Sequence, residues 1–177
     1  MRRTLTAVVL SFAALMLALS SALASGPPSR TPDAKAVPLL GTAKVTLLQG
    51  IQQVQVKYGR VIEAKFELDD SGALSLSIYP AKGYDVFKEV SGSATSSPWK
   101  SSAEVIKARE DVVNSTFDLT ILQQSKIGLA TAVRRALAQQ PGIAYWAIPT
   151  LRGKQAEIGV YVRSSDGKSH HLFIPVG

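Results

Sequence analysis

The apolar positions between residues 46 and 59 predict an amphipathic helix. They recur at steps of four, three and four residues, which places them on one helix face: Leu47, Ile51, Val54 and Tyr58. Thr46 and Gln49 have the spacing of a capping box at the start of this helix. Gly59 follows the last turn, where a glycine can end a helix in a left-handed conformation.

Three strands are predicted after this helix. Apolar and polar residues alternate strictly over residues 62–68, which is typical of a strand buried on one face. Residues 69–72 form a turn by composition, and a second alternating strand follows at 74–79. The stretch 80–83 turns the chain again, before a weaker third strand at 84–90. Tight turns make these strands antiparallel neighbours, and the apolar stripe of the helix should cover their apolar face.

The same order recurs about eighty residues later in the chain. Residues 125–133 repeat the pattern of residues 43–51: small, Lys, β-branched, small, Leu, two variable residues, small, β-branched. A second helix is predicted from 129 to 140, and Pro141 and Gly142 end it. The strands predicted after it cover 142–151, 157–163 and 170–176, with turns at 152–154 and 165–167.

One residue of the second repeat sits badly in its strand. Pro149 has no N–H to donate to a neighbouring strand. The strand at 142–151 is therefore expected to lie at an edge of the sheet or to carry a bulge.

The segment between the repeats predicts a partly helical linker. Ser101 and Glu104 have capping-box spacing, and the apolar residues that follow predict a helix from about 102 to 114. Whether this helix continues to residue 124 is left open by the pattern. Taken together, these patterns predict an α+β fold of two tandem modules, each a helix packed on a three-stranded antiparallel sheet. The modules cover residues 39–92 and 125–177, and the linker covers 93–124.

The N-terminus has the pattern of a secretory signal peptide. Arg2 and Arg3 precede an uncharged apolar stretch, and a small-x-small cleavage site ends at Ala24. The alternative is an uncleaved membrane anchor, because residues 5–24 are just long enough to span a bilayer. Residues 25–38 are rich in Pro and polar side chains and are expected to form a disordered leader. A periplasmic or secreted location follows from the signal-peptide interpretation.

Composition narrows the class of protein. The chain has no cysteine, so the exported part is not a disulfide scaffold and must be stabilised by its core. Removal of Arg2 and Arg3 lowers the formal net charge from +7 to +5, which indicates a mildly basic protein. No nucleic-acid-binding motif is present, and a nucleic-acid partner is not expected. A membrane contact is expected only through an uncleaved signal segment, and the oligomeric state is not predicted.

Both repeats resemble PepSY domains. Residues 44–47 and 59–64 look like the opening of such a domain, and residues 126–133 with 141–142 look like a second copy. The turn at 151–154 departs from the acidic turn of the family, and the usual closing V-D-A-x-T-G is missing from both copies. PepSY modules are similar to part of the propeptides of thermolysin-like metallopeptidases. The resemblance implies a non-catalytic module that binds, and restrains, a secreted or periplasmic peptidase.

A search for chemistry predicts no enzyme, no cofactor and no metal site. His170 and His171 are adjacent in a strand, so they point to opposite faces and cannot easily ligate one ion together. Asp69 and Asp70 lie in a turn, where Asp is favoured because it hydrogen-bonds to the backbone. No serine stands in a Gly-x-Ser-x-Gly elbow.

Three aromatic residues are the candidate contacts for a partner: Trp146, Tyr145 and Trp99. Tyr145 and Trp146 are neighbours in one strand, so at least one of them is expected to face away from the core. The competing interpretation is that the outward ring is covered by the other module or by the linker. The sequence therefore predicts a binding protein that contacts a peptidase. The alternative is an envelope structural or sensory module that binds a wall polymer, a lipid or a small ligand.

Overall fold

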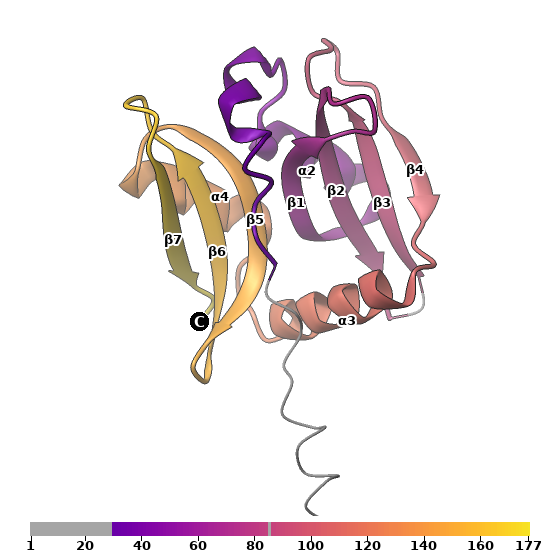
Figure 1. Ribbon diagram of the computed structural model, residues 1–177. Coiled ribbons are helices and arrows are strands. Elements are labelled where there is room, and N and C mark those ends of the chain that lie inside the picture. Colours follow the sequence, from indigo (N-terminus) through magenta and orange to yellow (C-terminus); the bar gives the residue numbers. More distant parts are fainter. Residues whose placement is uncertain (1–29, 85) are drawn as a thin grey trace, which may run out of the picture. The chain divides into compact units, whose positions relative to one another are not determined.

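The computed structural model describes residues 30–84 and 86–177 (Figure 1). The helices are η1 (Val37–Thr42), α2 (Leu47–Tyr58), α3 (Arg109–Gln123) and α4 (Leu129–Gln139). The strands are β1 (Arg60–Leu68), β2 (Leu74–Lys82), β3 (Val86–Ser93), β4 (Ser102–Val105), β5 (Ile143–Arg152), β6 (Gln155–Arg163) and β7 (Ser169–Pro175). The predicted signal peptide, residues 25–29 of the predicted leader and Asp85 lie outside the described residues.

The seven strands form one antiparallel sheet in the order β4-β3-β2-β1-β5-β6-β7. The α+β prediction is therefore confirmed. The expected division into two three-stranded sheets is not observed, because β1 and β5 pair with each other through Ala64–Ala147 and Lys65–Trp146. This pairing gives partners to main-chain groups that would otherwise lie on open edges of two smaller sheets.

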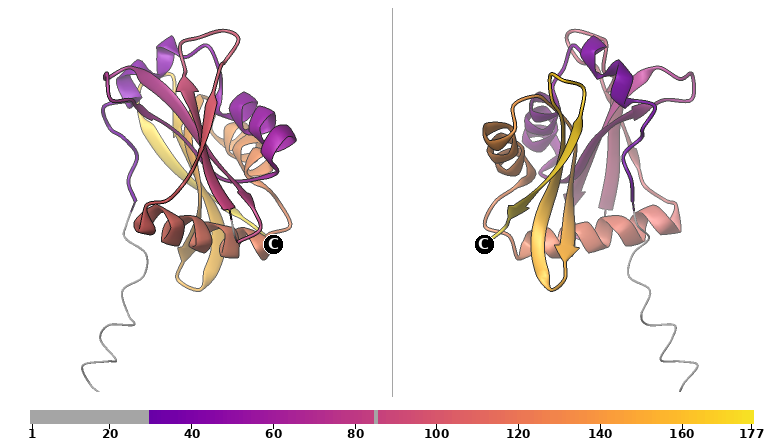
Figure 2. Two further views of the ribbon diagram at one scale, coloured as in Figure 1. Left: turned by 90° about the vertical axis from the view of Figure 1, so that its right-hand side faces the viewer. Right: turned by 60° about the vertical axis from the view of Figure 1, so that its left-hand side comes forward.

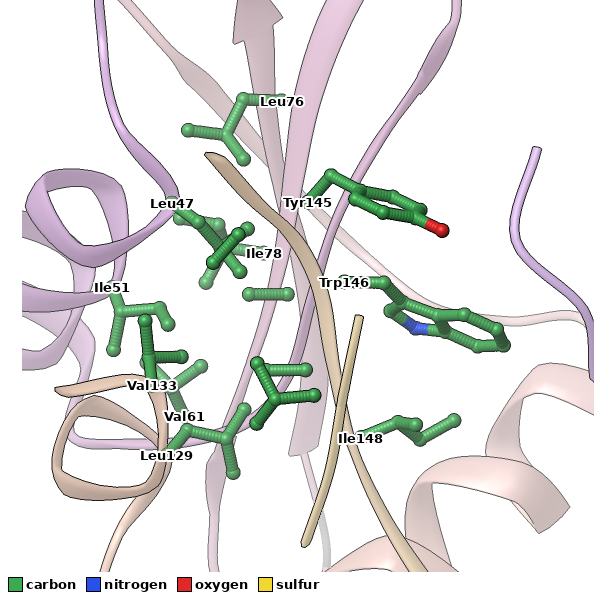
Figure 3. Close-up of a cluster of buried hydrophobic side chains, with 14 of the residues drawn as sticks. Leu47, Ile51, Val61, Leu76, Ile78, Leu129, Val133, Tyr145, Trp146 and Ile148 are labelled. Carbon is green, nitrogen blue, oxygen red and sulfur yellow. The ribbon is translucent and has the colours of Figure 1, made fainter. Parts of the chain in front are cut away.

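The helices cover the two faces of the sheet unequally. Figure 2 shows α2 and α4 side by side on one face, whereas α3 crosses one end of the opposite face. The core lies between the sheet and the α2–α4 layer. Its central side chains are buried and close together in Figure 3: Leu47, Ile51, Val61, Leu76, Ile78, Leu129 and Val133. Each such side chain contributes about 1.5–3 kcal/mol when it leaves water, so this layer is a main stabiliser of the sheet.

The α2 helix forms as its sequence predicts. The Gln49 N–H donates to Thr46 Oγ1 at 3.2 Å, and the Thr46 N–H donates to Gln49 Oε1 at 2.9 Å, which completes the capping box. Gly59 ends the helix at φ 95°, a left-handed conformation that favours glycine. Gly50 lets the helix lie close to β2, because a Cβ at this position would be 2.5 Å from Leu76 Cδ2.

The linker differs from its prediction. Residues Ser102–Val105 form β4, an exposed edge strand paired with β3, and α3 begins only at Arg109. The prediction of a helix from about 102 to 114 is therefore wrong at its start. Ser101 and Glu104 have capping-box spacing, but pairing with β3 satisfies the main-chain groups of this segment instead. The helix continues to Gln123, which answers the question that the pattern left open.

The described part of the predicted leader is ordered against the sheet. A side-chain oxygen of Asp33, Oδ2, accepts a hydrogen bond of 3.0 Å from the Leu68 N–H. Ala36 is buried, and Arg163 Nη1 donates to the Val37 carbonyl at 3.1 Å. The expectation of a disordered leader over 25–38 is therefore wrong for its described part, because its backbone is anchored and Ala36 is buried. Among the described residues, no helix is both long and apolar enough to cross a membrane.

A register shift in β1 and another in β5 interrupt the alternation of side chains. The shift in β1 falls between Val61 and Glu63, and the shift in β5 falls between Ala144 and Trp146. The bulge expected for the strand of Pro149 is therefore present, although it lies closer to the start of the strand. Pro149 lies outside the two residue pairs that join β5 to β1, so its missing N–H removes no hydrogen bond between these two strands.

Candidate functional site

Four rings form a continuous row across β5, β6 and β7, on the face opposite α4; we call Trp146, Tyr161, His171 and Phe173 the aromatic row. The Trp146 and Tyr161 rings stack with centroids 5.0 Å apart and an interplanar angle of 20°. Tyr161 stacks on the His171 imidazole at 3.9 Å and 16°. The His171 and Phe173 rings follow at 4.1 Å, tilted by 40°.

Strand register explains why these rings meet. Trp146 lies opposite Tyr161, and Tyr161 lies opposite His171, so the three strands place one ring each at the same level of the sheet. Gly159 provides room for this arrangement, because a Cβ there would be 2.7 Å from His171 Nε2. Phe173 pairs with Gly159 and therefore stands on the same face as His171.

The row becomes more exposed towards the edge strand β7. Trp146 is only 3% exposed and Tyr161 is half-buried, whereas His171 is exposed and Phe173 is 38% exposed. His171 is thus held against Tyr161, and Phe173 is held against His171. Side chains fixed in this way lose little conformational entropy when a partner covers them.

An ion pair supports the outer end of the row. The Arg152 guanidinium lies over the Phe173 ring, with Cζ 5.2 Å from the ring centroid. Glu157, whose side chain is buried, holds Arg152 through two hydrogen bonds of 2.8 Å. The hydrogen bonds from Arg152 lower the pKa of Glu157 below its usual range, although its burial acts in the opposite direction.

Burial also changes the protonation of the row itself. His171 is exposed overall, but partial removal of its ring from water lowers its pKa, so its neutral form is favoured at neutral pH. The same cause raises the pKa of Tyr161, with a smaller contribution from Tyr145. The stacked part of the row is therefore uncharged at neutral pH.

On the β1–β3 part of this sheet face, three carboxylates lie near Lys65 and Tyr79: Glu63, Glu67 and Glu89. Lys65 Nζ lies 2.7 Å from Glu67 Oε2 and 5.3 Å from the Tyr79 ring centroid. Burial alone would lower the pKa of Lys65, but Glu67, Glu63 and Glu89 outweigh it and the pKa is raised. Burial, and then the same carboxylates, raise the pKa of Tyr79.

The three aromatic residues predicted as partner contacts are all buried. Tyr145 and Trp146 point to the same side of β5, between the N-terminal segment and α3 (Figure 3). The register shift at this point explains why alternation fails for them. Trp99 is 7% exposed, and its Nε1 donates to the Gly92 carbonyl at 3.3 Å. None of the three offers an exposed anchor. Tyr145 and Trp146 do face away from the α2–α4 layer, but α3, which belongs to the predicted linker, and the N-terminal segment cover them. This is the competing interpretation, in which the linker covers the outward ring.

The other side chains considered for chemistry have structural surroundings. Asp69 Oδ1 accepts hydrogen bonds from the Ser71 and Ala73 N–H groups at 3.0 and 2.9 Å, as its turn position predicts. His170 lies 3.1 Å from Ser164 Oγ, whereas His171 stacks on the opposite face. No group of three or more His, Cys, Asp or Glu side chains suited to a metal occurs within the described residues.

The outer rings of the aromatic row were missed by sequence reasoning. His171 was considered only as a metal ligand, and Phe173 was read as part of a strand. A sequence signal for them does exist. His171 and Phe173 are two residues apart in one predicted strand, and Gly159 and Tyr161 are two residues apart in the preceding strand. Residues two apart in one strand point to the same sheet face, and a glycine in the neighbouring strand leaves space for a ring.

Comparisons with known proteins give no family. No protein-family model matches the chain, and no curated protein matches it. Among solved structures, a crystal structure from Clostridium difficile 630, described as a "putative lipoprotein", is similar with a TM-score of 0.39 and 13% sequence identity. The match covers 76% of this chain and 88% of that chain. A likeness at this level carries no argument about fold or function.

Proposed function

We propose that the chain contains two tandem, divergent PepSY-like modules. The order helix, strand, strand, strand occurs as α2-β1-β2-β3 and again as α4-β5-β6-β7. The Lys44 N–H donates to the Ala94 carbonyl, and the Lys126 N–H donates to the Val176 carbonyl, both at 2.8 Å. Each repeated lysine thus ties the start of its module to the residue that directly follows the third strand. The equivalent positions of these bonds support the proposal.

The join between β1 and β5 supports the same proposal. Ala64 and Ala147 pair across this join. Each is the second residue after the register shift of its own strand. The residues directly before them, Glu63 and Trp146, hydrogen-bond to each other. Equivalent residues therefore meet at the join, as two copies related by an approximate two-fold axis would require.

We propose further that the protein is exported and acts as a non-catalytic binding protein. The N-terminal signal pattern supports a periplasmic or secreted location. The PepSY resemblance makes a secreted or periplasmic peptidase the expected partner class. The single observation that carries the binding role is the aromatic row, in which the exposed His171 and Phe173 continue from the buried Trp146 and the half-buried Tyr161. Aromatic anchors of this kind dominate the energies of many protein interfaces.

The test uses the chain from residue 25 onward and a purified thermolysin-like metallopeptidase as the probe. We expect the protein to bind the peptidase in biolayer interferometry and to slow its cleavage of a peptide substrate. The double variant His171→Ala/Phe173→Ala should weaken this binding by roughly 2 kcal/mol or more. Both side chains are exposed, so the variant should keep its fold, which circular dichroism verifies.

Val56→Ala is the matched control, because Val56 is 91% exposed on α2, a helix on the other side of the sheet. Peptidase binding that survives in the double variant would place the contact elsewhere. Absence of binding to the peptidase would reject the partner class while leaving the aromatic row to be tested on other exported proteins.

A further inference from the structure

A pocket lies where the end of α2 meets β2 and β3, away from the aromatic row. It is lined by Lys57, Tyr58, Pro80, Lys82, Val86 and Lys88. Half of these residues are lysines, although they come from a helix and two strands that are separate in the sequence. The fold therefore gathers three ammonium groups around one opening.

Tyr58 is the centre of this pocket. Lys57 Nζ lies 5.0 Å from the centroid of its ring, and Lys88 Nζ lies 5.3 Å from the same centroid. Lys82 pairs with Val86 in the strands and lines the same opening. The aromatic ring offsets part of the repulsion between the ammonium groups, because its face carries partial negative charge.

The positive charge of the pocket is not balanced by the part of the chain that the structure describes. None of Lys57, Lys82 and Lys88 forms an ion pair with a described carboxylate. The C-terminal end of α2 carries about half a negative charge, which offsets only part of one lysine's charge. Within the described residues, the three ammonium groups therefore exceed the negative charge around the pocket. A pocket with this excess favours an anion with more than one negative charge.

We propose that this pocket binds a phosphoryl group, either free or as part of an anionic lipid headgroup. A phosphoryl group has up to two negative charges and three acceptor oxygens, which three lysines can approach from different sides. Pro80 and Val86 form an apolar wall beside the lysines, where the carbon part of a phosphate ester can pack. The proposal does not depend on the peptidase partner, because the two sites share no residue.

The first experiment follows inorganic phosphate binding by ¹⁵N–¹H NMR on the chain from residue 25 onward. We expect saturable shifts of the amides around Tyr58, Lys82 and Lys88. In the double variant Lys82→Gln/Lys88→Gln, the affinity should fall about tenfold or more, because each charge-assisted hydrogen bond contributes strongly. Lys154→Gln removes one exposed lysine from the β5–β6 turn and should leave the affinity within about twofold of the parent.

The second experiment separates the two sources of the phosphoryl group. Vesicles of phosphatidylglycerol and phosphatidylcholine are sedimented with the protein, and vesicles of phosphatidylcholine alone serve as the control. Vesicle binding that the double variant loses supports a lipid headgroup. Phosphate binding without vesicle binding supports a free phosphate ester. Absence of saturable binding to both probes overturns the proposal, as does binding that is equal in the double variant and the parent.

Discussion

The indole N–H of Trp146 donates a hydrogen bond of 2.8 Å to Oε1 of Glu63, across the join between β1 and β5. Both side chains are buried, at 3% and 7% exposure. Each residue follows the register shift of its own strand, so the bond links two similarly placed positions of the sheet. It couples the two halves at a point where few main-chain pairs do so.

Removal of the Trp146 side chain should therefore destabilise the fold. We expect Trp146→Ala to lower the free energy of unfolding by about 3–5 kcal/mol, because a large buried side chain leaves a cavity. Trp146→Phe should cost less, but it leaves Glu63 without the indole donor. A double-mutant cycle of Trp146→Phe with Glu63→Leu, which removes the acceptor, should give a coupling energy of about 1 kcal/mol in urea unfolding. Additive effects would show that the hydrogen bond contributes little.

Gly50→Ala sets helix propensity against packing. Alanine is favoured over glycine in a helix by about 1 kcal/mol. The new Cβ, however, would lie 2.5 Å from Leu76 Cδ2 and 2.8 Å from Ile78 Cδ1, both fully buried side chains. Overpacking costs about 1–3 kcal/mol, so we expect a net loss of stability in thermal unfolding. Gly41→Ala is the control, because nothing lies within 4 Å of its added Cβ, and an increase in stability for Gly50→Ala would contradict the packing.

The protonation of His171 should make stability depend on pH. Its pKa in the fold is lowered from 6.5 by burial, so the unfolded chain binds more protons between the two pKa values. The contribution of the neutral ring is fully present above the unfolded pKa. It is lost as the pH falls from there through the folded pKa. Urea unfolding at about pH 7.5 and about pH 5 should show this loss in the parent and a smaller one in His171→Gln. Equal losses in the two proteins would assign the effect to another group.

Arg152→Gln should show how far the stability of the fold and the pKa of Glu157 depend on Arg152. The Glu157 carboxylate is buried, and Arg152 supplies two hydrogen bonds to it. Because the Arg152 side chain is 62% exposed, we expect only a moderate loss of stability in urea unfolding. The pKa of Glu157 should rise in the variant, as an NMR titration can measure. Arg135→Gln, an exposed change on α4, should alter neither quantity.

Local pattern predicted much of the fold because much of it is decided locally. The capping residues and apolar stripe of α2, and the turn at Asp69, act within a few residues. The alternation over 62–68 matches β1, which the structure places at Arg60–Leu68. Elements of this kind need no knowledge of distant partners.

Long-range contacts explain what pattern could not predict. β4 is a strand because β3 is beside it, and α3 buries Asn114, Ser115 and Asp118 together with Leu119 and Leu122, so its apolar stripe is weak. The alternation rule placed Tyr145 and Trp146 on opposite faces because a register shift has no clear local signal. The aromatic row depends on the register of β5, β6 and β7 together, which only the sheet reveals.

The pairing of Ala64 with Ala147 has a consequence for how such a chain could arise. An antiparallel pair between similarly placed residues is what one strand makes with a second copy of itself. On the proposal of two tandem modules, a shorter ancestor with a single module would have formed this seam as a symmetric homodimer. Gene fusion would then have required only a connection such as β4 and α3, because the contacts at the seam already existed. After such a fusion, equivalent positions such as Glu63 and Trp146 would have been free to diverge.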